Sequence, residues 1–371
     1  MPTTLDFRSD TVTRPTPAMR LAMAQAEVGD DVFGDDPTVA QLQTEAAQSL
    51  GFEASLYVSS GTQANLIALM TQCARGEEAI VGQQSHAYRW ESGGMAVLGS
   101  IQPQPLENQA DGTLDLDLVA ATIKPDDPHF ARTRLLALEN TMGGKVLPVP
   151  YLQAAGDLCR HYGLIAHLDG ARLMNAAVAC TQTTDVAETP SAEQILHSAR
   201  AICAPFDSVS LCLSKGLGAP IGSLLLGSQE MIARAIRVRK MLGGGMRQVG
   251  LLAAAGRHAL AHHLTRLADD HANAARLAQG FRELNNGTSP LAGQLSVEGA
   301  HTNMVFVTVA STIAARLQEH LAACGVLCSG AALVDGRARQ RWVTHLDADA
   351  KAVDEALDRL ATFKLGAPLS A

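Results

Sequence analysis

The stretch Ser-Val-Ser-Leu-Cys-Leu-Ser-Lys-Gly-Leu-Gly-Ala-Pro-Ile-Gly-Ser, residues 208–223, places one lysine directly after a short apolar run. The run is too short for a typical helix and predicts a buried strand over 208–213. Lys215 therefore follows the end of a strand, with glycines at 216 and 218 beside it. A lysine held in partly apolar surroundings loses part of its hydration, and its amine can then act as a nucleophile. The alternative is a solvated loop lysine, which is the usual fate of this residue type.

A second apolar run ends on charged residues in the same way. Leu-Ile-Ala-His-Leu-Asp-Gly-Ala-Arg, residues 164–172, carries Asp169 and Arg172 at its end. A lysine, an aspartate and an arginine at strand ends are the groups that a pyridoxal 5′-phosphate (PLP) site needs: a Schiff-base amine, an anionic partner for the pyridinium nitrogen and a cation beside the ring. Taken singly, Asp169 could be a helix N-cap and Arg172 a surface charge. The three together favour the cofactor site.

Length and composition limit the class of protein. The chain has 371 residues, of which 47% are hydrophobic and 18% charged, which is enough for one large core and a smaller domain. A net charge of −8 argues against a nucleic-acid partner. The first residues lack a secretory leader pattern, and no apolar run reaches membrane-spanning length. Seven scattered cysteines indicate reduced thiols, so we expect a cytoplasmic protein with no membrane partner.

Short apolar runs alternate with helical patterns from residue 54 onward. This alternation predicts an α/β fold with a mostly parallel sheet, whose ligands collect at the carboxyl ends of the strands. The organisation predicted is a large domain over 1–255, which includes an N-terminal arm, and a linking helix with a small α/β domain over 256–371. The polar segment 181–200 is expected to be a surface excursion. The expected strands of the large domain are 54–58, 79–81, 134–138, 164–168, 208–213 and 223–226, and its expected helices are 63–73, 116–123, 151–162 and 172–178.

The first expected strand leads into Ser59-Ser60-Gly61-Thr62-Gln63-Ala64-Asn65, which opens a helix. Unsatisfied backbone N–H groups and the helix dipole make such a start suitable for a phosphate. An ordinary helix cap explains the same residues when they are taken alone. Together with Lys215 and Asp169 they favour phosphate binding.

Two histidines are candidates for proton transfer. His86 follows the next expected strand, where its ring could also stack on a flat cofactor. His129 precedes another strand, in Pro-Asp-Asp-Pro-His-Phe-Ala-Arg. Either could equally be a polar loop residue, although a reaction that moves a proton near neutral pH needs such a group.

Three cations complete the set of candidates. Arg341 opens a strand of the small domain, where an arginine can bind an α-carboxylate with two hydrogen bonds, or lie on the surface. Lys240 and Arg247 flank a glycine-rich turn and suit a phosphate, although a basic helix end is the simpler account. No metal is expected: His258 and His262 lack the glutamate of a metalloprotease motif, and the cysteines at 324 and 328 lack a second pair.

With these residues assembled, the chain resembles the low-specificity L-threonine aldolases, which are fold type I PLP enzymes. The similarity covers nearly the whole length and lies in extended motifs that occur in the expected order. They are residues 8–15 (Arg-Ser-Asp-Thr-Val-Thr-Arg-Pro), 29–38 (Gly-Asp-Asp-Val-Phe-Gly-Asp-Asp-Pro-Thr), 60–65, 126–141, 168–172, 213–223 and 239–248. The resemblance implies a PLP-transferase-like fold, with a mostly parallel seven-stranded sheet in the large domain and a smaller C-terminal α/β domain.

The resemblance also implies roles for individual residues. Lys215 would form the Schiff base, Asp169 would pair with the pyridinium nitrogen and Arg172 would approach the ring hydroxyl. Ser60, Gly61 and Thr62 would hold the phosphate, and His86 would stack on the ring. Ser9, Arg172 and Arg341 would bind the substrate carboxylate, with His86 and His129 near its hydroxyl. Lys240 and Arg247 would reach the cofactor site of a neighbouring subunit, which implies a dimer or the tetramer usual in the family.

The activity implied is the reversible cleavage of L-threonine, L-allo-threonine and related β-hydroxy-α-amino acids to glycine and an aldehyde. Lys215, His86 and His129 are the expected catalytic residues of this lyase. Other fold type I enzymes share the cofactor residues, so an aminotransferase or a β-eliminating lyase is the alternative. A non-catalytic PLP-binding homologue is a further alternative.

Overall fold

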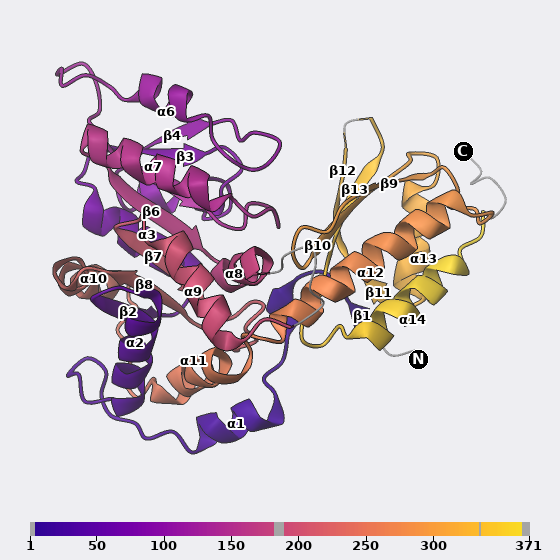
Figure 1. Ribbon diagram of the computed structural model, residues 1–371, viewed down its shortest axis with the longest axis horizontal. Coiled ribbons are helices and arrows are strands. Elements are labelled where there is room, and N and C mark those ends of the chain that lie inside the picture. Colours follow the sequence, from indigo (N-terminus) through magenta and orange to yellow (C-terminus); the bar gives the residue numbers. More distant parts are fainter. Residues whose placement is uncertain (1–3, 182–188, 334, 366–371) are drawn as a thin grey trace. The chain divides into compact units, whose positions relative to one another are not determined.

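A computed structural model describes residues 4–181, 189–333 and 335–365. The chain divides into two compact units: Pro15–Thr265 forms one, the large unit, and Met1–Arg14 with Arg266–Ala371 forms the other, the small unit (Figure 1). This division differs from the boundary expected at 255/256. The N-terminal arm, expected in the large domain, belongs to the small unit because its first strand pairs there.

The large unit is built on one seven-stranded sheet. Its strand order is β2-β8-β7-β6-β5-β3-β4, and every adjacent pair is parallel except the two that involve β8, which is antiparallel to β2 and β7. The expected mostly parallel sheet is therefore confirmed. The strands are β2 (Ala54–Val58), β3 (Glu78–Gly82), β4 (Gln102–Leu106), β5 (Thr133–Glu139), β6 (Ile165–Gly170), β7 (Ser208–Cys212) and β8 (Ser223–Gly227).

Side chains alternate between the two faces of this sheet, and helices cover both. On β2, Leu56 and Val58 join the apolar cluster that includes α3 and α10, whereas the Ser55 hydroxyl and the Tyr57 amide bond to Gln43 of α2. Helix α7 contacts β6, and α9 packs on α2 and α7. The helices of this unit, shown in Figure 1, are α1 (Pro17–Ala24), α2 (Pro37–Leu50), α3 (Gly61–Gln72), α4 (His86–Arg89), α5 (Gly94–Val97), α6 (Leu116–Thr122), α7 (Val149–Tyr162), α8 (Leu173–Thr181), α9 (Ala192–Cys203), α10 (Gln229–Met241) and α11 (Gly250–His262).

Within the segment 181–200, residues 192–200 do not form the surface excursion that the composition predicted, because they belong to a packed helix. Residues 182–188 lie outside the described part of the chain, but α9 begins at Ala192. Ser191 and Gln194 form a capping box at its start, and α9 buries Ile195, Ala199 and Ile202 against the rest of the unit. The apolar residues recur at helical spacing within a polar segment, so average composition was the wrong guide.

The small unit contains a four-stranded antiparallel sheet of order β12-β13-β10-β9 and a separate parallel pair formed by β1 and β11. Three helices pack with these strands around a core that includes Phe7, Phe281 and Trp342. Where the sequence predicted one linking helix, the structure has two helices, α11 in the large unit and α12 in the small one. The remaining elements are β1 (Leu5–Asp6), η1 (Asp10–Val12), α12 (Leu267–Asn286), β9 (Leu295–Glu298), β10 (Met304–Val309), α13 (Ala314–Ala323), β11 (Val326–Leu327), β12 (Ser329–Ala332), β13 (Ala338–Val343) and α14 (Ala350–Ala361).

All seven cysteines are free thiols. Within the described residues, no helix combines the length and the apolar character needed to cross a membrane.

Candidate active site

Asp169 lies at the end of β6 and is buried. Its Oδ2 accepts a hydrogen bond of 2.7 Å from Nδ2 of Asn65, and its Oδ1 accepts one of 2.9 Å from the backbone N–H of Ala171. The Ser210 hydroxyl on β7 lies 3.4 Å from Oδ1. A carboxylate offers about four acceptor positions, so this one can still accept a further N–H donor. The arrangement suits the pyridinium nitrogen of PLP.

Asn65 is held in one orientation by the groups around its amide. Its Oδ1 lies 2.8 Å from the Ser210 hydroxyl and 3.3 Å from Nε2 of His167. Both of these groups donate to Oδ1, so the NH₂ group must face the two carboxylates of Asp169 and Glu91. Burial lowers the pKa of His167 to about 4, so this ring is neutral and has one donor nitrogen.

A chain of hydrogen bonds therefore runs in one direction toward Asp169. Nε2 of Gln72 donates to the Ser208 hydroxyl at 2.8 Å, and this hydroxyl donates to Nδ1 of His167, also at 2.8 Å. His167 then donates to Asn65, and Asn65 donates to Asp169. Every step points a donor group toward Asp169, so the chain of hydrogen bonds fixes the orientation of the groups around this carboxylate.

His86 is the first residue of the short helix α4. Its Nδ1 lies 2.9 Å from Oε1 of the buried Glu91, and its backbone N–H donates to Oε2 of Glu139 at 2.6 Å. The hydrogen bond with Glu91 raises the pKa of His86, although burial opposes this shift. The ring is therefore protonated to a higher pH than a free histidine.

Lys215 lies in the loop after β7 and is half-buried. Its positive charge lowers the pKa of both His86 and Glu139, which places the ammonium within electrostatic range of the His86 cluster. Strands β6 and β7 are parallel neighbours. Asp169, near the end of β6, and Lys215, after the end of β7, therefore both lie at the carboxyl ends of these strands. The two groups expected to hold the cofactor ring are brought together.

The start of α3 presents unpaired polar groups that suit a phosphate. The Ser60 hydroxyl caps the helix by accepting from the backbone N–H of Gln63, while the N–H groups of Gly61 and Thr62 have no acceptor among the described residues. The buried Ser223 hydroxyl has no partner in the described chain either, and a Cβ added to Gly61 would lie 3.8 Å from it. Unpaired donors at a helix start fit an anion, so these residues fit the PLP phosphate.

The remaining predicted residues lie on other segments of the chain. Arg172 precedes α8 and is half-buried. His129 is an exposed loop residue with Nδ1 2.6 Å from Oδ1 of Asp127. Ser9 caps η1 in the small unit, where Nη2 of Arg341 donates to the carbonyl of the adjacent Arg8 at 3.0 Å. Arg341 therefore contacts the residue that precedes Ser9.

Lys240 and Arg247 lie at and after the end of α10. Lys240 is exposed and lines a pocket of about 400 Å³ together with Phe33 and Ile236, and Arg247 forms an ion pair with Asp30 at 2.9 Å.

Sequence reasoning missed Asn65, Glu91 and Glu139 as members of the site. The signals were present: Asn65 lies one helical turn after Gly61, and Glu91 lies five residues after His86. These residues are polar side chains that the fold removes from solvent, and the sequence does not show which polar side chains will be removed from solvent.

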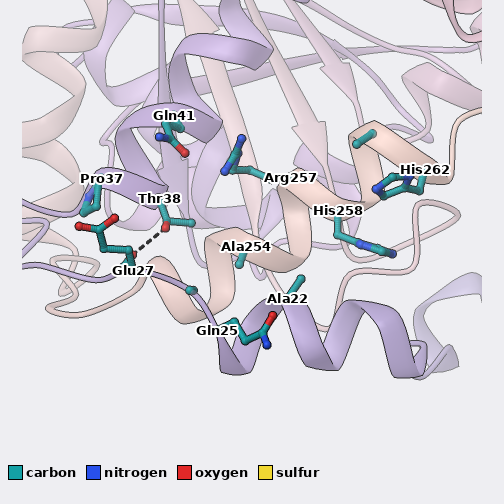
Figure 2. A pocket seen from close by; sticks show the side chains of 12 residues that line it. Ala22, Gln25, Glu27, Pro37, Thr38, Gln41, Ala254, Arg257, His258 and His262 are labelled. Atoms are coloured by element: carbon teal, nitrogen blue, oxygen red, sulfur yellow. Dashed lines mark hydrogen bonds between the residues drawn. The ribbon is translucent and has the colours of Figure 1, made fainter.

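A second pocket, of about 430 Å³, lies elsewhere in the large unit between α1, the start of α2 and α11 (Figure 2). Gln25, Thr38, His258 and His262 are among its lining residues, and the Thr38 hydroxyl donates to the carbonyl of Glu27. None of the predicted catalytic or binding residues lines it.

Comparison with known proteins agrees with this geometry. The family model of the beta-eliminating lyases matches residues 6–312. The low-specificity L-threonine aldolase of Escherichia coli strain K12 is 52% identical over 345 residues, which cover 92% of this chain and 94% of that protein. A probable low-specificity L-threonine aldolase 2 of Arabidopsis thaliana is 42% identical over 312 residues, 82% of each chain.

Solved structures show the same fold at low sequence identity. The Leishmania major threonine aldolase superposes with a TM-score of 0.78 at 21% identity, covering 96% of this chain and 98% of that one. The serine palmitoyltransferase of Sphingomonas wittichii gives a TM-score of 0.71 at 19% identity, covering 97% and 86%. The fold is thus that of the fold type I PLP enzymes, and the chain belongs to the low-specificity L-threonine aldolase family of PLP-dependent lyases.

Proposed function

We propose that this protein cleaves L-threonine, L-allo-threonine and related β-hydroxy-α-amino acids to glycine and an aldehyde, in a reversible reaction with PLP as cofactor. The observation that carries the proposal is the placement of Lys215 and Asp169 at the same edge of the sheet, with Asp169 held by a one-way chain of donors. The 52% identity with a low-specificity L-threonine aldolase over most of both chains supports the substrate class.

Different residues of the chain would have different roles in the reaction. Lys215 would hold the cofactor covalently, and Asp169 would keep the ring nitrogen protonated. When bound, the cofactor would supply an electron sink for the Cα–Cβ bond that breaks. A base takes the proton of the β-hydroxyl group as the Cα–Cβ bond breaks, and the aldehyde leaves. Return of a proton to Cα gives glycine.

We propose that Arg341, with Ser9 and Arg172, binds the substrate carboxylate, because an arginine can hold a carboxylate with two parallel hydrogen bonds. His129, or a water that it orients, is the proposed base for the hydroxyl proton, and His86 is the rival candidate. The contact of His86 with Glu91 favours the rival, because this histidine lies within the cofactor cluster and His129 is exposed.

Lys240 and Arg247 are proposed to act at the site of a neighbouring subunit in a homodimer or homotetramer. Large apolar side chains are exposed around Lys240: Phe33, Ile236 and Met241. Exposed apolar residues gathered in one place are typical of a protein–protein interface. The free thiols are consistent with the proposed cytoplasmic location.

β-Elimination is the second candidate, because the matching family model is that of the beta-eliminating lyases. The test is to incubate the purified protein with L-threonine and analyse the products. Acetaldehyde and glycine in equal amounts are expected, whereas 2-oxobutanoate with ammonia would replace the proposal by elimination. A product that forms only with an added oxo-acid would indicate transamination, and PLP binding without turnover would indicate a non-catalytic homologue.

Two variants test the residues in the same assay. Lys215→Ala should abolish turnover, and native turnover in this variant would contradict the role of the lysine. His129→Ala should lower the rate of aldehyde formation while the absorbance of the bound cofactor persists. An unchanged rate would remove His129 from the mechanism and leave His86 as the base.

A further inference from the structure

Glu91 is a buried glutamate that the mechanism above does not use. Its side chain is only 4% exposed, although it follows a short helix near the surface. Burying a carboxylate is unfavourable unless hydrogen bonds compensate for the lost water. The hydrogen-bond donors that contact Glu91 are therefore what holds its carboxylate in place.

Two donors reach the same oxygen of Glu91. Nδ1 of His86 lies 2.9 Å from Oε1, and Nδ2 of Asn65 lies 2.9 Å from the same atom. Asn65 cannot rotate its amide away, because its Oδ1 accepts from Ser210 and His167. The carboxylate is thus fixed by α3, and it in turn fixes one nitrogen of the His86 ring.

We propose that Glu91 is a positioning residue for His86: its carboxylate binds Nδ1 of the imidazole and leaves Nε2 as the ring nitrogen available to cofactor or substrate. A histidine presents its two nitrogens differently according to the bond that one of them makes. Nδ1 carries the proton that Glu91 accepts, so in the neutral ring Nε2 is the acceptor. Whether His86 stacks on the ring or takes a proton, its orientation is then set before substrate binds.

The electrostatic surroundings support the same role. Charged groups face His86 from several elements: Glu91 beyond α4, Glu139 on β5, Asp169 on β6 and Lys215 after β7. A ring nitrogen of His86 and carboxylate oxygens of Glu91 and Asp169 lie within 4.8 Å of one another. The bond to Glu91 is the largest cause that raises the pKa of His86, and the Lys215 charge and burial act against it. Removing the Glu91 charge should therefore lower this pKa.

The catalytic part of this proposal rests on the proposed function, but its first test does not. Histidine labelled with carbon-13 at Cε1 gives one NMR signal per ring, and loss of one signal in His86→Asn identifies that of His86. In the full-length holoenzyme, Glu91→Gln should lower the titration midpoint of this signal by roughly one pH unit, because an opposite charge in contact raises a histidine pKa by about that much or more. An unchanged midpoint would overturn the proposal.

The chain offers a matched control for the loss of a buried carboxylate. Glu78 is fully buried, and it contacts Lys124 and Thr133 at the opposite end of the sheet's strands from Lys215. Glu78→Gln should leave the His86 midpoint unchanged, and an equal shift in this variant would show that the effect is only structural. Glu91→Asp, which keeps the charge, should give a midpoint between those of Glu91→Gln and the natural protein. Should Glu91→Gln fail to fold, a midpoint equal to the natural one in Glu91→Asp overturns the proposal.

A second readout is the pH profile of L-threonine cleavage. In Glu91→Gln, the limb of the kcat/KM profile set by His86 should move to lower pH, and kcat should fall more than KM changes. A natural protein that forms no acetaldehyde would refute the proposed function and leave the NMR result intact. An active natural protein whose profile is the same in Glu91→Gln would refute the role of Glu91 alone.

Discussion

Glu139, the last residue of β5, is partly buried, and its carboxyl group is surrounded by other charges. Burial and the neighbouring Asp169 raise its pKa to about 7, although the bond from the His86 backbone and the Lys215 charge oppose the shift. At neutral pH this residue can therefore carry a proton inside the cofactor cluster. The local sequence, Glu-Asn-Thr, does not predict the raised pKa, because the charges that shift it lie on three other segments.

The pH dependence of stability tests this assignment. The pKa is raised above its unfolded value, so folding is favoured at low pH, and the benefit is lost as the pH rises from about 4.5 through about 7. We expect the natural protein to lose more unfolding free energy between pH 4.5 and pH 8 than Glu139→Gln does. Chemical denaturation of both proteins, without cofactor, measures the difference. Asp270 has a similarly raised pKa but is present in both proteins, so it cancels. Equal slopes would refute the assignment.

Asp36 shows how one side chain can fix the starts of two helices. Its Oδ1 accepts from the backbone N–H groups of Thr38 and Val39 at 3.1 Å, which caps α2. Its Oδ2 accepts from the N–H of Gly250 at 2.8 Å, at the first residue of α11. Asp36 and Gly250 are 214 positions apart in the sequence, and α2 and α11 pack on each other. The cap of α2 is visible in the sequence Asp-Asp-Pro-Thr, but the contact with α11 is not.

Substitution of Asp36 should therefore cost more than the loss of an ordinary cap. We expect Asp36→Ala to lower the free energy of unfolding by about 2 kcal/mol, against about 1 kcal/mol for Ser191→Ala, which removes the cap of α9 alone. Chemical denaturation of both variants measures the comparison. Equal losses would mean that the bond to Gly250 contributes little.

Strand β4 shows where sequence patterns fail at the scale of an element. Its sequence Gln-Pro-Gln-Pro-Leu contains two prolines, which normally argue against a strand. The strand is nevertheless formed because it lies at the edge of the sheet and pairs only with β3. A proline that lacks a donor is tolerated on the side of an edge strand that has no neighbour. Position in the sheet, which sequence periodicity does not reveal, decided this case.

At the scale of the whole molecule, the proposed homo-oligomer makes a prediction of its own. If Lys240 acts at the neighbouring subunit's site, mixed oligomers of Lys215→Ala and Lys240→Ala should contain some intact sites. Random pairing in a two-fold dimer restores about a quarter of the natural number of sites. Unfolding and refolding the two inactive variants together, followed by the threonine assay, measures this recovery. Refolding each variant alone is the control, and no gain on mixing would contradict a shared site.

The sequence by itself determined the fold class, the family and the central residues of the site. Lys215 and Asp169 follow apolar runs long enough to predict strands, and parallel strands bring their carboxyl ends to one edge. The start of α3 could also be predicted, because a helix cap depends only on residues that are neighbours in the sequence. Such local rules can be read without the fold.

Only the tertiary structure decided how the site is held and charged. Asn65, Glu91, Glu139 and His167 come from separate segments, and their bonds and pKa shifts exist only when those segments are packed together. The same holds for β1, whose two residues pair with a strand more than 300 positions away and so place the N-terminal arm in the small unit. Desolvation and long-range pairing depend on distance in space, and a linear pattern does not contain that distance.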